Sequence, residues 1–222
     1  MPPGVQYTHI QPRRPHMTTT ILLTRHGQTE WNREERFRGR MDLPLNSTGE
    51  RQAEALAERL AAFPVSAIYS GPLQRAQRTA EICSHRLGLP YQVLPGLLDV
   101  DYGQWQGLSP AEVADRYPEQ YRQWRDAPAQ VRFPGGESFA EMQARAVAAL
   151  EDVISRHSGQ TVVLVAHMGV NKALLCAVLG LDLSHYWALR QDTCCLNIFR
   201  CLAPQRYEIV TLNDTCHMDG VG

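Results

Sequence analysis

Residues Ile21-Leu22-Leu23-Thr24-Arg25-His26-Gly27 join a short apolar run to a basic pair and a glycine. The apolar run is typical of a buried strand, which predicts Arg25 and His26 at its carboxyl end. In open α/β sheets, ligands bind at this edge. Gly27 lets the backbone come close to whatever His26 contacts. His26 is a candidate nucleophile, but for either basic residue alone the simpler interpretation is a loop-capping His or a solvated Arg.

Two other segments support the interpretation that Arg25 and His26 belong to a ligand site at the edge of the sheet. The run Thr161–Ala166 is the most β-branched apolar stretch of the chain, and His167 and Gly169 follow it. The run 65–70 is followed by a helix whose first turn contains Arg75. Because parallel strands share their carboxyl edge, Arg25, His26, Arg75 and His167 are expected to converge. Two Arg and two His beside helix N-termini describe a site for a tetrahedral dianion.

The alternation of strands and helices predicts the fold class. We expect a three-layer α/β/α sandwich around a mostly parallel sheet, with a helical insertion over the site. Residues 1–17 are expected to form an N-terminal extension, and 18–222 a single domain with an insertion at about 96–136. The expected strands are 21–26, 65–70, 91–94, 161–166, 194–200 and 206–212, and the expected helices are 47–63, 73–87, 109–117, 119–126, 138–157 and 170–179.

Composition excludes several classes of protein. The formal net charge of −1 argues against nucleic acid as a partner, and no apolar run approaches the length of a membrane span. The first residues contain four prolines and no apolar core, so no signal peptide is expected. Six cysteines without a CxxC pair predict reduced thiols in the cytoplasm, with neither a zinc site nor a disulfide framework. Nothing requires a metal or another cofactor.

Six blocks of sequence, in order, resemble branch 1 of the histidine phosphatase superfamily, the phosphoglycerate mutase-like proteins. The resemblance runs from about residue 20 to about residue 200 and implies one antiparallel edge strand in the sheet. A lone Arg-His-Gly would be weak evidence, whereas six ordered blocks are specific. The blocks are Thr24–Asn32, Phe37–Gly49, Ser70–Ala80, Asp99–Gly107, Gly135–Ser138 and Ala166–Val170.

The resemblance also implies residue roles. His26 would attack phosphorus and become a phosphohistidine. Arg25, Arg75, His167 and Asn32 would hold the phosphoryl oxygens. A carboxyl group would protonate the leaving oxygen and later take a proton from water. The remaining candidates for substrate binding are Gly27, Thr29, Arg38, Gly169 and Met168.

The sequence departs from the family pattern at two positions. The family has Glu where this chain has Asp99, whose side chain is shorter. Asp99 is the first candidate for the proton donor because it matches by position, and Asp101 is the second because it lies on the same side of an extended segment. Arg38 stands where the phosphatase pattern often has Gln. It would favour a second anionic group on the substrate, or it is a solvated residue of the charged run 33–40.

The favoured function is metal-independent hydrolysis of a small phosphorylated metabolite. One alternative is a phosphoglycerate mutase, in which the phosphohistidine passes its phosphoryl group to a second hydroxyl. The other is a non-catalytic phosphoanion-binding protein that has lost turnover through the change at Asp99. The sequence names neither the natural substrate nor the oligomeric state, for which a homodimer is one option.

Overall fold

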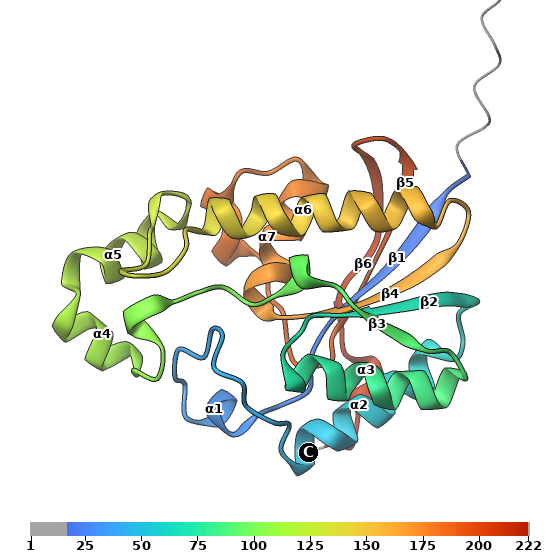
Figure 1. Cartoon of the computed structure of the whole chain (residues 1–222), viewed down its shortest axis with the longest axis horizontal. Coiled ribbons are helices and arrows are strands. Elements are labelled where there is room, and N and C mark those ends of the chain that lie inside the picture. The colour runs from blue at the N-terminus through green and yellow to red at the C-terminus, as the bar shows by residue number, and fades with distance from the viewer. Residues whose placement is uncertain (1–16, 222) are drawn as a thin grey trace, which may run out of the picture.

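The structure of the protein is a computed structural model that describes residues 17–221 (Figure 1). Except for Met17, the expected N-terminal extension lies outside the described residues. Within that range, one sheet has the strand order β3-β2-β4-β1-β5-β6. Its strands are β1 (Thr19–Arg25), β2 (Val65–Ser70), β3 (Tyr91–Val93), β4 (Thr161–Ala166), β5 (Leu196–Ala203) and β6 (Arg206–Asp214).

The sheet is mostly parallel, with an antiparallel edge. β1, β2, β3 and β4 pair in parallel, whereas β5 runs antiparallel to β1, and the edge strand β6 runs antiparallel to β5. The antiparallel edge implied by the family resemblance is therefore confirmed. β5 begins later than expected, at Leu196, because Cys194 lies in a turn with φ +51°, outside the extended region.

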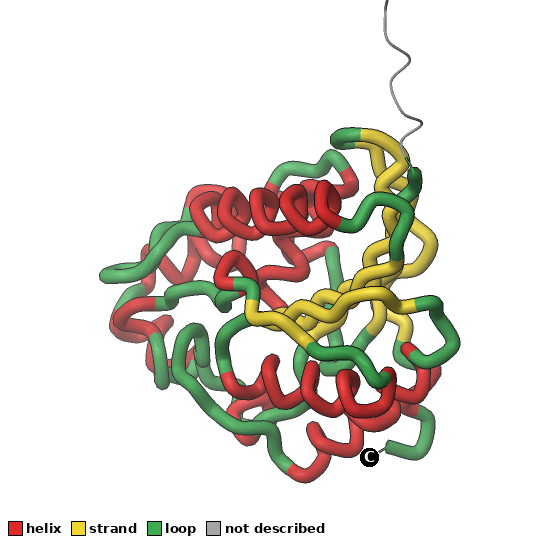
Figure 2. Tube along the Cα trace, turned by 45° about the vertical axis from the view of Figure 1, so that its right-hand side comes forward, coloured by secondary structure: helices red, strands yellow, loops and turns green. Residues whose placement is uncertain are grey.

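Helices cover both faces of the sheet. Ile21 and Leu23 of β1 belong to the core beneath α6 (Phe139–Arg156) and α7 (Met168–Leu179), and Leu22 belongs to the core on the opposite face. That face packs against α2 (Ser47–Leu60) and α3 (Gln74–Leu87). Figures 1 and 2 show the sheet between these two helical layers. The predicted three-layer α/β/α sandwich is confirmed, and burial of both faces explains the continuous apolar strands.

A helical insertion links β3 to α6. It contains α4 (Pro110–Arg116), α5 (Pro118–Asp126) and the 3₁₀ turns η1 (Pro95–Leu97), η2 (Gly103–Trp105) and η3 (Pro128–Gln130). The fully buried indole of Trp105 anchors it, with ring centroids 5.1 Å from those of Phe37 and Phe133. Phe37 follows α1 (Glu30–Arg33), so the insertion packs on the loop after β1.

Two short segments complete the fold after α7, the 3₁₀ turns η4 (Leu183–Ala188) and η5 (Cys216–Met218). Within residues 17–221, no helix combines the length and the apolar character needed to cross a lipid bilayer.

Candidate active site

The two central parallel strands bring two histidines together. Arg25 at the end of β1 is in register with Ala166 at the end of β4, so His26 and His167 leave the sheet side by side. The backbone N–H of His26 donates to the carbonyl of Ala166 at 3.0 Å, and the two imidazole centroids lie 5.2 Å apart. Both rings therefore occupy the carboxyl edge of the sheet, where ligands bind in this fold class.

A hydrogen bond fixes the tautomer of His26. Its Nδ1 lies 2.6 Å from the carbonyl oxygen of Gly27. Because a carbonyl oxygen only accepts, Nδ1 carries the hydrogen and Nε2 carries the lone pair. Burial, followed by the charges of Arg75 and His167, lowers the pKa of His26 well below its usual value of 6.5. His26 is therefore neutral at neutral pH, the form that a nucleophile needs.

Gly27 and Thr29 shape the loop around the pocket without lining it. A Cβ on Gly27 would lie 2.4 Å from the carbonyl oxygen of Gly49 in the first turn of α2, so only glycine fits there. Thr29 caps α1, and its N–H and hydroxyl both donate to Oδ1 of Asn32 at 2.9 Å. This arrangement leaves the amide hydrogens of Asn32, which does line the pocket, for a ligand. The structure thus shows Gly27 and Thr29 shaping the loop beside the pocket, and their expected contacts with substrate stay a prediction.

Asp99 lies in the pocket wall, next to Arg75 and His167. Its Oδ2 accepts from Nη2 of Arg75 at 2.9 Å and lies 3.6 Å from Nδ1 of His167. Burial raises the pKa of Asp99, but the charges of His167 and Arg75 outweigh burial, so the pKa falls below its usual value of 3.8. The free protein therefore holds Asp99 as a carboxylate at neutral pH.

Asp101, the second candidate for the proton donor, points elsewhere. Its Oδ2 pairs with Nη1 of Arg40 at 3.1 Å, and its Oδ1 accepts from the N–H of Gly103 at 2.9 Å. Asp101 is absent from the lining of the pocket that contains His26 and Asp99. The geometry favours Asp99 for chemistry and gives Asp101 a role in the loop.

Arg145 on α6, which no sequence motif singled out, holds the segment that carries Asp99. Its guanidinium donates to the carbonyls of Gly96, Leu98 and Asp99 at 3.0, 2.5 and 3.1 Å. Nη2 of Arg145 also pairs with Glu137 at 2.7 Å. Three carbonyls bound to one guanidinium fix the path of this segment, and so fix where the short Asp99 side chain can reach.

Arg25, Arg36 and Arg38 line the pocket, and because Arg36 pairs with Glu34, the unpaired positive charge comes from Arg25 and Arg38. Nη1 of Arg25 donates to the carbonyl of Gln191 at 2.8 Å, and Nη1 of Arg38 donates to the carbonyl of Trp31 at 3.0 Å. Among the described residues, Nε of neither arginine has a hydrogen-bond partner. Burial lowers the pKa of Arg38 to about 10, so this side chain is still charged at neutral pH. Arg38 is therefore a pocket residue and not the solvated arginine of the alternative interpretation.

Arg75 and His167 stand behind the pocket wall. Both are fully buried, and neither lines the pocket. Arg75 donates to the carbonyls of Met41 and Gly39, both at 2.7 Å, as well as to Asp99. Burial lowers the pKa of His167 to about 3, against the opposite effect of Asp99. Among the described residues, Nε of Arg75 and Nε2 of His167 have no hydrogen-bond partner, so the expected role of both residues in holding phosphoryl oxygens stays a prediction.

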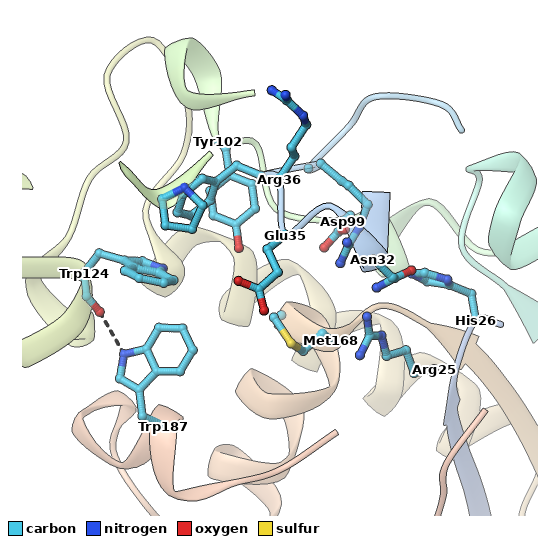
Figure 3. Close-up of a pocket in the computed structure, with 15 residues that line it drawn as sticks. Arg25, His26, Asn32, Glu35, Arg36, Asp99, Tyr102, Trp124, Met168 and Trp187 are labelled. Atoms are coloured by element: carbon cyan, nitrogen blue, oxygen red, sulfur yellow. Dashed lines mark hydrogen bonds between the residues drawn. The ribbon is translucent and has the colours of Figure 1, made fainter. Parts of the chain in front are cut away.

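The pocket has a volume of about 410 Å³ and two chemically different ends. Figure 3 shows Arg25 and His26 at one end, and Trp124 of α5 and Trp187 of η4 at the other. Met168 and Gly169, which were expected to contact substrate, line it as well. The sequence did not single out Glu35, which lies between the two ends, because the charged run 33–40 reads as a solvated face.

Among the described residues, no three His, Cys, Asp or Glu side chains gather in a way that would hold a metal ion. The groups that could bind an anion in the pocket are the two arginines, the Asn32 amide and the imidazole of His26.

Comparison with known proteins identifies this arrangement. Residues 21–215 match the histidine phosphatase superfamily (branch 1). Phosphoserine phosphatase 1 of Hydrogenobacter thermophilus is 37% identical over 89% of this chain and 93% of its own length. The metal-independent phosphoserine phosphatase of Arabidopsis thaliana is 34% identical over 92% of this chain and 85% of its own.

Solved structures agree with the sequence matches. Bacillus stearothermophilus YhfR superposes with a TM-score of 0.85 at 32% identity, covering 90% of this chain and 99% of that chain. A mycobacterial glucosyl-3-phosphoglycerate phosphatase superposes with a TM-score of 0.81 at 29% identity, with the same coverage.

The fold, the site and these matches define a phosphoryl-handling α/β enzyme. The chain belongs to branch 1 of the histidine phosphatase superfamily, and the family resemblance is confirmed. It is a phosphatase, a phosphoric monoester hydrolase, which sets aside the non-catalytic alternative.

Proposed function

We propose that the protein hydrolyses a small phosphorylated metabolite through a phosphohistidine formed on His26, without a metal ion. The observation that carries the proposal is the hydrogen bond from Nδ1 of His26 to Gly27, which leaves Nε2 as the basic nitrogen. The guanidinium groups of Arg25 and Arg38 line the same pocket. They supply the positive charge that a phosphoryl transition state requires.

In the first step, the lone pair of Nε2 attacks phosphorus, and the bond between phosphorus and the ester oxygen breaks. Asp99 donates a proton to the leaving oxygen, so that a neutral alcohol departs. Asp99 is a carboxylate in the free protein, but a phosphate dianion bound beside it adds negative charge. This charge raises the pKa of Asp99 and favours the protonated form in the complex.

In the second step, Asp99 is again a carboxylate and takes a proton from a water molecule. The water oxygen attacks phosphorus, the bond between nitrogen and phosphorus breaks, and inorganic phosphate leaves with His26 restored. We propose that Arg75 and His167 hold Asp99 during both steps, since both lie against its Oδ2.

We also propose a cytoplasmic location. Cys83, Cys176, Cys194, Cys195, Cys201 and Cys216 are all free thiols. Five of them are buried, and free thiols persist in reducing compartments.

The proposal is tested with protein treated with a chelator and a panel of phosphomonoesters. The panel includes 3-phosphoglycerate with and without 2,3-bisphosphoglycerate, and both phosphate release and isomerisation are followed. We expect phosphate release that is unaffected by the chelator and lost in His26→Ala, with His85→Ala, at an exposed histidine, as the matched control. An acid-labile phosphoprotein should accumulate in a rapid quench of the wild type only.

Other outcomes would contradict the proposal in distinct ways. Isomerisation that exceeds phosphate release would make the protein a mutase. Phosphate release that survives in His26→Ala would rule out the phosphohistidine, and release that requires added metal would rule out the metal-independent mechanism.

A further inference from the structure

A carboxylate stands in the middle of the anion-binding pocket without a counter-charge. Glu35 lines the pocket, and Figure 3 shows its carboxylate directed between Met168 and the two indoles of Trp124 and Trp187. Glu35 is exposed, and among the described residues its carboxylate makes no side-chain hydrogen bond and no ion pair. A site that only binds phosphate has no use for a negative charge at this place, because the charge opposes the ligand.

Nearby arginine does not neutralise Glu35. The guanidinium of Arg36 pairs with Glu34 at 3.0 Å and donates to the carbonyl of Gly107 at 2.8 Å. Figure 3 shows Arg36 directed away from Glu35. The carboxylate of Glu35 is therefore available to a ligand.

The backbone at Glu35 is held in an unusual conformation. Its φ of +53° lies in the left-handed region, which is strained for a residue with a Cβ. Such strain is tolerated where the surrounding structure enforces it, and it gathers at ligand sites. Here the turn follows α1 directly and places the side chain of Glu35 against the pocket.

The rings beside Glu35 form a rigid aromatic corner. Trp124 and Trp187 meet edge to face with centroids 4.7 Å apart, and Nε1 of Trp187 donates to the carbonyl of Trp124 at 2.8 Å. Phe37 packs edge to face on Trp124 at 5.2 Å. Indole faces attract cations through their negative quadrupole, and a carboxylate beside them strengthens this attraction.

The protein already places one cation against this corner. Nζ of Lys172 lies 4.5 Å from the ring centroid of Trp187 and 5.1 Å from that of Tyr186. Lys172 does not line the pocket, so the cavity side of Trp187 is left for a ligand. The ammonium of Lys172 opposes a second cation. Burial lowers its pKa to about 8, which leaves part of the population neutral in mildly basic solution.

We infer that Glu35, Trp124 and Trp187 form a cation subsite that selects phosphomonoesters whose alcohol carries an ammonium group. The inference rests on the proposed function, because the phosphate must occupy the end with Arg25 and His26. An ammonium at the other end of such a substrate would meet the carboxylate and the indole faces. The same carboxylate would disfavour substrates with a second anionic group, against the expectation that Arg38 raised from sequence.

Two pairs of isosteric phosphate esters test this subsite. Phosphocholine is compared with 3,3-dimethylbutyl phosphate, in which carbon replaces the charged nitrogen, and phosphoethanolamine is compared with propyl phosphate. Each ester competes against p-nitrophenyl phosphate as reporter, so that a Ki is obtained whether or not the ester is itself hydrolysed. The ratio of Ki values within a pair removes effects that both esters share.

We expect the wild type to bind each charged ester about tenfold more tightly than its neutral isostere. Glu35→Gln should bring both ratios close to one. Glu34→Gln, which removes the same charge one residue away and outside the pocket, should keep the wild-type ratios.

Ratios near one in the wild type would overturn the inference while leaving the phosphatase intact, and so would ratios that Glu35→Gln does not change. A lack of p-nitrophenyl phosphate hydrolysis by the wild type would instead contradict the proposed function, and the subsite would fall with it.

Discussion

The short side chain of Asp99 reaches the pocket because its neighbours hold it there. Arg75 and His167 lie against Oδ2 from behind, and Oδ1 accepts from the N–H of Val100 at 2.9 Å. Asp99 is 7% exposed and lines the pocket. The carboxylate thus combines fixed orientation with access to the substrate, the two requirements for proton transfer.

Asp99→Asn should lower kcat for alkyl phosphates by about two to four orders of magnitude. The amide can neither protonate the leaving oxygen nor take a proton from the attacking water. The loss should be much smaller for p-nitrophenyl phosphate, whose leaving group departs without protonation. Steady-state kinetics on the two substrates give this comparison, which a merely structural role would not produce.

Asp101→Asn is the matched control, since its side chain can still accept from Gly103. Equal losses in the two variants, or a larger loss in Asp101→Asn, would transfer the proton donor to Asp101.

At the level of elements, α6 holds the segment that carries Asp99 and also contributes to the core. One face of the helix buries Phe139, Met142 and Leu150 against the sheet. Arg145 on the same helix reaches the carbonyls of Gly96, Leu98 and Asp99. The helix therefore couples the insertion to the sheet, which explains how a long excursion can hold the Asp99 carboxylate in place.

Arg145→Gln should lower kcat for alkyl phosphates by about tenfold to a hundredfold, with little change for p-nitrophenyl phosphate, because Asp99 loses its fixed position. Arg156→Gln on the same helix is the control, since Arg156 pairs with Asp152 away from the pocket. A uniform loss on both substrates in Arg145→Gln would mean that the residue stabilises the fold without positioning Asp99.

For the whole molecule, the buried histidines link stability to pH. Burial lowers the pKa of His167 to about 3 and lowers that of His26 well below 6.5. Between these folded-state pKa values and about pH 6.5, the folded protein therefore binds fewer protons than the unfolded chain. Stability therefore rises with pH there and is lost as the pH falls from about 6.5 towards the folded values. Asp99, whose pKa is lowered, adds its own loss only at more acidic pH.

Urea denaturation at pH 7 and pH 5 should show a lower free energy of unfolding at pH 5. His167→Gln should make this decrease smaller, because the variant has no imidazole to protonate in the unfolded chain. Part of the decrease should persist, because partial burial also lowers the pKa of His217 and because His26 is unchanged. His85→Gln, at an exposed site, should keep the full decrease, and the same outcome for His167→Gln would contradict the linkage.

The sequence by itself determined the sheet and the meeting of the two histidines. Apolar runs such as Thr161–Ala166 form buried strands because no other local structure hides so many β-branched side chains, and parallel pairing then places both strand ends at one edge. The ordered sequence blocks added the family.

Only the tertiary structure decided which residues of neighbouring sequence positions face the pocket. The family pattern ranked Asp99 before Asp101, and the structure adds that Arg145 and Arg40, from distant segments, hold the two residues in different places. Glu35 is an exposed residue of a charged run, and it lines the pocket only because the insertion and η4 fold beside it. These outcomes depend on contacts between residues far apart in sequence, whose energies outweigh local preferences.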